Sequence, residues 1–222
     1  MKRLIYNFSL ICGLLLTLAA FPVFAQNGEV ELNKRPLQGL GESALNKVQK
    51  REVDLKAPFS LTLQGKVGAN GKFDAKTAKF TKSEGDAKII DLAKQAIAAV
   101  NDSGMFSYLK QLGLNDVEIT LVQTGTEFSA SLKSTLENEN RAKSVTNGIK
   151  LTLQLGKMMI EQRKNKRDDD RNPIALLENS KAESVGKDFL LKFSMPLEEF
   201  HAIINRELEL AEKRQILYRN NP

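Results

Sequence analysis

The amino-acid sequence predicts an α+β fold, an antiparallel sheet built from three strand-strand-helix units with the helices on one face. Two observations lead to this prediction. Alternating apolar and polar residues, the pattern of half-buried strands, occur in three pairs along the chain. Each pair is followed by apolar residues three and four apart, the spacing of a helix with one buried face. Joining the strands into one sheet, or two small sheets, buries the apolar sides under one layer of helices and leaves the other face polar.

The first unit is the most completely marked. Strands are predicted over 61–67 and 73–82, and Asn70-Gly71 between them is typical of a tight hairpin turn. A helix is predicted over 87–101, with Asp86 placed to cap its free N–H groups. The architecture prediction rests chiefly on this unit.

The second and third units repeat the pattern. A hairpin is predicted over 117–136, followed by a helix over 139–163. The third unit contains strands over 181–185 and 189–195, joined by a short turn that contains Gly186. A C-terminal helix begins at Pro196, a residue suited to the first helical position, and the basic tail over 214–222 is expected to fray.

The helix over 139–163 is apolar over much of its circumference. One stripe is expected to face the core, and it comprises Ala142, Val145, Ile149, Leu153, Gly156 and Ile160. A second stripe comprises Leu151, Leu155, Met158 and Met159. Since apolar helix faces are mostly core, burial between layers is the favoured interpretation, and a partner-binding face is the alternative. These four residues are the candidate binding residues.

The N-terminus has the three parts of a secretory signal over residues 1–25. Lys2 and Arg3 are followed by an apolar stretch and a small-residue cleavage pattern that ends at Ala25. A periplasmic or secreted location is therefore expected. Cys12 would be discarded with the signal, which leaves no cysteine for disulfides, thiol catalysis or a thiolate metal site.

Three further segments complete the predicted organisation. Residues 26–52 are read as a linker or a short, loosely docked helix, because their apolar residues are sparse. The globular body then divides into 53–136, with the first unit and the second hairpin, and 137–213, with the long helix, a charged loop, the third hairpin and the C-terminal helix.

Removing Lys2 and Arg3 lowers the formal net charge from +6 to +4, with both signs interspersed. No basic face or nucleic-acid-binding motif is present, so a nucleic-acid role is not expected.

The charged loop has part of the spacing of a calcium site. Asp168, Asp170 and Asn172 match the first, third and fifth positions of a calcium loop. Pro173 stands where the turn glycine is needed, and Asn179 stands where a bidentate glutamate is needed. A solvated loop is the better interpretation, and no metal site is assigned.

The sequence offers little for catalysis. His201 is the single histidine, and with Glu198 it forms a Glu-x-x-His pair used in carboxylate-bridged metal sites. Such a site needs further ligands, so a histidine at the boundary of the core is the favoured interpretation. No nucleophile elbow or complete phosphate-binding loop is found. Catalytic residues, metal and cofactor are therefore all predicted to be absent.

Residues 62–121 resemble the C-terminal domain of the TonB family. In that family a strand with a turn glycine is followed by a second strand, a Ser-x-Gly-type turn and an alanine-rich amphipathic helix. Here residues 67–72 look like the hairpin, 83–86 like the turn and 89–100 like the helix, while 117–121 could stand for the following strand. The resemblance implies a component of envelope transport.

The chain also departs from that family. TonB-type transducers keep an uncleaved inner-membrane helix and a proline-rich spacer, whereas this sequence has five scattered prolines after Pro22. The Trp-Arg-Phe type ending of the family helix is absent, because the chain contains no tryptophan. These departures argue against force transmission even if the fold is shared.

Together these patterns favour an exported, non-enzymatic interaction module of the cell envelope. Its expected partner is an envelope protein or peptide, or a second copy of the chain, bound through a sheet edge or a helix face. The candidate edges are 73–82 and 181–185, although their lysines also discourage strand pairing. A TonB-like transport component and an uncharacterised hydrolase are the alternatives, and membrane attachment would require an uncleaved signal.

Overall fold

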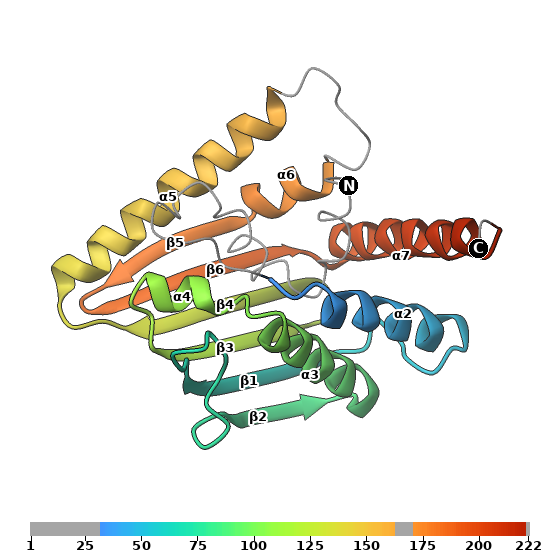
Figure 1. Ribbon diagram of the computed structural model, residues 1–222, viewed down its shortest axis with the longest axis horizontal. Coiled ribbons are helices and arrows are strands. Elements are labelled where there is room, and N and C mark those ends of the chain that lie inside the picture. The colour runs from blue at the N-terminus through green and yellow to red at the C-terminus, as the bar shows by residue number, and fades with distance from the viewer. Residues whose placement is uncertain (1–31, 163–170, 221–222) are drawn as a thin grey trace.

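The computed structural model describes residues 32–162 and 171–220. A helix is followed by three successive strand-strand-helix units, as predicted (Figure 1). In chain order the elements are α2 (Arg35–Gln49), β1 (Phe59–Lys66), β2 (Lys79–Gly85), α3 (Ala87–Asp102), α4 (Ser107–Gln111), β3 (Asp116–Gln123), β4 (Glu127–Thr135), α5 (Glu139–Glu161), α6 (Arg171–Glu178), β5 (Ser180–Val185), β6 (Asp188–Pro196) and α7 (Leu197–Asn220).

All six strands in the described part of the chain belong to one antiparallel sheet. Their order is β2-β1-β3-β4-β6-β5, so β2 and β5 form its two edges. The predicted α+β class is therefore confirmed, and the choice between one sheet and two is settled in favour of one. The two segments proposed as edges overlap the edge strands: β5 corresponds closely to the predicted 181–185, whereas β2 shares only residues 79–82 with the predicted 73–82.

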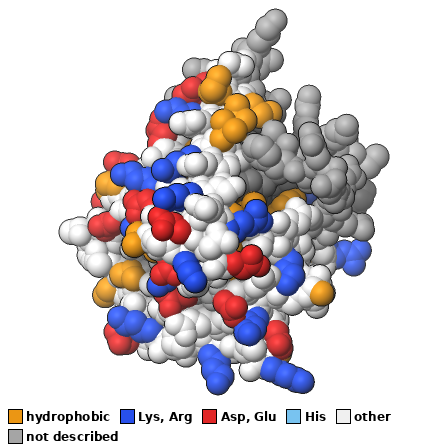
Figure 2. Space-filling model, turned by 90° about the vertical axis from the view of Figure 1, so that its left-hand side faces the viewer, with side chains coloured by type: hydrophobic (Ala, Val, Ile, Leu, Met, Phe, Trp, Pro, Cys, Tyr) orange, Lys and Arg blue, Asp and Glu red, His pale blue; other side chains and the backbone are white. Residues whose placement is uncertain are grey.

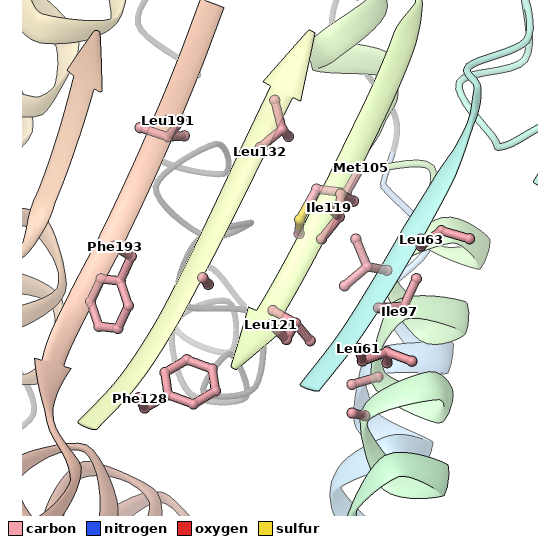
Figure 3. Packing of buried hydrophobic residues seen from close by; sticks show 14 of the residues in the cluster. Leu61, Leu63, Ile97, Met105, Ile119, Leu121, Phe128, Leu132, Leu191 and Phe193 are labelled. Carbon is pink, nitrogen blue, oxygen red and sulfur yellow. The ribbon is translucent and has the colours of Figure 1, made fainter. Parts of the chain in front are cut away.

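The sheet buries one face and leaves the other polar. Figure 3 shows the buried face, which carries Leu61, Leu63, Ile119, Leu121, Phe128, Leu132, Leu191 and Phe193. Between these residues, polar side chains alternate onto the opposite face. Thr62 and Thr120 lie directly opposite each other there, with their hydroxyl oxygens 3.2 Å apart. Alternation thus predicts the two faces correctly because side chains of a strand point alternately to opposite sides.

The first hairpin is longer than predicted. Gly71 adopts a positive φ of 68° in the turn, as expected for Asn-Gly, and Val67 pairs with Phe73 across it. The chain then makes a second turn, in which Ala78 N–H donates to the Asp74 carbonyl at 2.9 Å. Strand β2 therefore covers 79–85 instead of the predicted 73–82. Of the turn expected over 83–86, only Asp86 lies outside this strand.

The cap of α3 is confirmed. The Asp86 carboxylate accepts hydrogen bonds from the N–H groups of Lys88 and Ile89 at 2.9 and 3.0 Å. These bonds satisfy two N–H groups that have no partner within the helix. Strand β2 therefore passes directly into a helix that packs on the same sheet.

The segment interpreted as a linker contains a core-packed helix. Helix α2 runs from Arg35 to Gln49 and buries Leu40, Ala44 and Leu45. Glycine and alanine make its apolar stripe sparse in the sequence, but small residues also allow close approach to a neighbouring element. Lys47 pairs with Asp91 of α3 at 3.3 Å, so α2 is docked on the body.

Two predictions about the C-terminal part need correction. The first concerns the charged loop, which was expected to include Asn172. Helix α6 instead begins at Arg171 and includes Pro173 in its first turn, where proline's missing N–H costs little. Asn172 is buried there and donates to the Glu207 carboxylate at 2.8 Å. The charged loop at 163–170, with Asp168 and Asp170, lies outside the described residues. Helix α7 continues to Asn220, so most of the tail expected to fray is helical.

Candidate functional site

Helix α5 is anchored to the sheet through its first turns. The Asn138 side chain caps it by accepting from the Arg141 N–H at 2.9 Å, and Glu139 pairs with Lys143 at 2.7 Å. Thr146 then donates to the Glu183 carbonyl of the edge strand β5 at 3.2 Å. The helix is thus positioned beside and over the β5 edge of the sheet (Figure 1).

One side of α5 belongs to the core. Its buried apolar residues recur three or four positions apart, as the sequence predicts. They are Ala142, Val145, Ile149 and Leu153, which are between 0% and 8% exposed. Gly156 and Ile160 of the same predicted stripe are only half-buried, so burial decreases toward the C-terminal end of the helix.

The second stripe of α5 faces solvent. Leu151, Met158 and Met159 are 48%, 50% and 57% exposed, and Leu155 between them is half-buried. Figure 2 shows hydrophobic side chains gathered near the top of this face, toward the C-terminal end of α5, among charges of both signs. The burial favoured for this stripe is therefore wrong for three of its four members. Grouped exposed apolar residues are typical of an interaction surface.

The exposed end of α5 is held in place by α6. Lys157 pairs with Glu178 at 2.6 Å, and the side chain of Leu177 lies near Gly156. The hydrogen bond to Glu178 and its negative charge raise the pKa of Lys157 above its ordinary value. The apolar stripe thus lies on a helix that contacts β5 near its start and α6 near its end.

His201 lies inside the protein and not at the boundary of the core. It is 3% exposed, its ring lies edge-on to that of Phe200, and its Nε2 atom has no hydrogen-bond partner among the described residues. Burial lowers the pKa of His201, and the positive charge of Lys56 lowers it further, while Glu198 and Asp54 act in the opposite direction. The imidazole is therefore neutral at pH 7.

The Glu-x-x-His pair does not form a metal site with other acidic residues. The Glu198 carboxylate instead pairs with Lys56 at 2.8 Å, and this contact lowers the pKa of Glu198. Among residues 32–162 and 171–220, no group of three His, Cys, Asp or Glu side chains could hold a metal ion. The pair is best explained by the docking of α7 on the segment before β1.

Of the two edges of the sheet, strand β2 is the more exposed. All seven of its residues are exposed, and its pairing with β1 contains an irregularity between Thr62 and Leu63. Lys79 and Lys82 lie on this strand, and Lys94 sits 5.0 Å above the ring of Phe80. A bulge and lysines are features by which proteins prevent unwanted pairing at an edge. The edge is thus less suited to binding than the α5 stripe.

Comparison of the chain with protein-family models, with curated proteins and with solved structures finds no match. The TonB resemblance therefore stays a prediction. No helix in the described part of the chain combines the length and apolarity needed to cross a membrane.

Sequence reasoning found the four stripe residues but could not decide their exposure. Both stripes of α5 are apolar, and the position of the sheet determines which one is buried. A signal was nevertheless present, because the second stripe contains two adjacent methionines. Methionine is common on surfaces that bind partners adaptively.

Proposed function

We propose that this protein is an exported, non-enzymatic interaction module of the cell envelope that binds protein partners through the exposed apolar stripe of α5. The stripe comprises Leu151, Leu155, Met158 and Met159. The proposal rests on the exposure of three of these residues on a helix that contacts β5 near its start and α6 near its end.

The chemistry of the stripe supports recognition of a helix. Its residues recur three and four positions apart, so they form a narrow apolar band along the axis of α5. Such a band matches the apolar face of another amphipathic helix. Unbranched methionine side chains can adjust to the shape of the partner.

The expected location rests on the N-terminal signal. Export with cleavage after Ala25 predicts that the purified protein begins at Gln26. Intact-mass measurement of the protein isolated from exporting cells tests this. A mass that includes residues 1–25 would instead favour a membrane-anchored protein.

Site-specific photocrosslinking tests the binding surface. A photoreactive amino acid at Leu151 or Met159 should give discrete adducts in the envelope of living cells. The matched control is Ala98, an exposed position on α3. Adducts at the two stripe positions and none at Ala98 would support the proposal. Equal adduct formation at Ala98, or no adduct at the stripe, would contradict it.

A further inference from the structure

The exposed side of α5 has the spacing of a coiled-coil seam. Positions 144, 148, 151, 155, 158 and 162 follow one another at alternating steps of four and three residues. Five of these positions are exposed and Leu155 is half-buried. The seam shares Leu151, Leu155 and Met158 with the apolar stripe, leaves out Met159, and continues for two turns toward the N-terminus of the helix.

Side-chain size is distributed unevenly along the seam. The N-terminal half carries the small residues Ser144 and Gly148, and the C-terminal half carries the large residues Leu155 and Met158. A Cβ atom added at Gly148 would meet no atom of the described residues within 4 Å, so these residues leave space above the glycine. One half of the seam thus leaves room for a side chain, and the other half offers large side chains.

These features make the seam complementary to itself. From them we infer that the partner of the α5 stripe is a second copy of the chain, bound with its α5 antiparallel to the first. In this register Leu151 packs against Leu155 of the second copy, and Met158 lies over Gly148 of the second copy. A parallel pair would place the glycines opposite each other and leave a gap. This inference rests on the proposed function and specifies the partner.

The polar groups also fit this arrangement. None of the six seam positions is charged, so the pairing buries no unpaired charge. Antiparallel pairing places the Asn147 amide beside the Glu161 carboxylate of the second copy, where it can donate a hydrogen bond. It also places Gln154 beside its own equivalent near the two-fold axis. The two helix dipoles are then oppositely oriented, which is favourable.

The contact is expected to be reversible. A single helix pair buries less surface than a standard interface, so we expect a weak association. Sedimentation of the full chain purified after export should therefore show a monomer at about 1 μM and a growing dimer fraction toward about 1 mM. A monomer at all these concentrations would overturn the inference.

Exchange of the large and small residues tests the register. Gly148→Leu should weaken the dimer by at least about tenfold, because the introduced leucine side chain would occupy the space needed by Met158 of the second copy. Adding Met158→Ala should restore dimerisation. The control is Gly39→Leu, since Gly39 is also a helical glycine with no atom within 4 Å of its Cβ position. Equal weakening by the control, or no rescue by the double variant, would contradict the register.

Cysteine cross-linking tests the orientation. Gln154→Cys should give a covalent dimer with a short bismaleimide, whereas Ser144→Cys should not, because the two copies of residue 144 would lie about 27 Å apart along the axis. The unsubstituted exported protein is the negative control, because cleavage of the signal is expected to remove Cys12 and to leave no cysteine to cross-link. Equal cross-linking of both variants would indicate parallel pairing and overturn the inference. Photoadducts at Leu151 with a different protein, together with a monomeric chain, would refute self-association while leaving the proposed binding surface intact.

Discussion

The two faces of α5 should respond very differently to truncation of an apolar side chain. Ile149 is 1% exposed and packs in the core, whereas Met159 is 57% exposed. Removing a buried isoleucine side chain loses its burial and leaves a cavity, so Ile149→Ala should cost about 2–5 kcal/mol of unfolding free energy. For a chain of this size, that corresponds to a fall in Tm of about 5–15 °C.

Met159→Ala should be almost neutral. Full burial of a methionine contributes about 1.5–3 kcal/mol, so a side chain that is more than half exposed contributes about 1 kcal/mol. Alanine has the higher helix propensity, which offsets part of this loss. We therefore expect a change in unfolding free energy of less than about 1 kcal/mol.

Urea denaturation followed by circular dichroism measures both variants. The measurement should be made at low micromolar protein concentration, where dimerisation would add little to the free energy of unfolding. Destabilisation of Met159→Ala equal to that of Ile149→Ala would mean that Met159 packs against the rest of the chain. The exposed stripe, and every proposal based on it, would then be wrong.

Three further predictions concern other parts of the fold. Acidification from about pH 7.5 to about pH 5.5 should lower the Tm, because burial holds the pKa of His201 below its ordinary value of 6.5 and the unfolded chain binds the proton more readily. Asp86→Ala should cost about 1 kcal/mol in urea denaturation through loss of two capping hydrogen bonds. Gly71→Ala should cost more than Gly104→Ala in the same assay. Both glycines have positive φ, but only at Gly71 would a Cβ clash with a neighbour, Ser107.

Each of these predictions has a clear contrary outcome. His201→Leu should flatten the Tm profile above about pH 5.5, since it removes the single histidine of the chain. The stabilising effect of the neutral imidazole is complete above pH 6.5 and declines below it, so an unchanged slope in this variant would refute the assignment. Asp86→Asn keeps a capping side chain and should retain most of the stability. Equal losses of unfolding free energy in Gly71→Ala and Gly104→Ala would show that backbone strain alone determines the effect of the substitution.

The sequence was most informative where a local signal has one structural meaning. Asn70-Gly71 specified a turn with a positive φ, and Asp86 specified the start of a helix, because the conformations involved depend on a few neighbouring residues. It was less informative over 73–78, where residues alternate like a strand but form a second turn held by the Asp74 carbonyl. It also missed α6, whose eight residues follow a charged segment.

By itself the amino-acid sequence determined the α+β class, the order of the three units and the polarity of the two sheet faces. These properties follow from side-chain periodicity, which records which side of a strand or helix is apolar. Only the tertiary structure decided the strand order, the docking of α2, the burial of His201 and the exposure of Leu151, Met158 and Met159. Those depend on contacts between residues distant in the chain, and the two apolar stripes of α5 become different only once the sheet covers one of them.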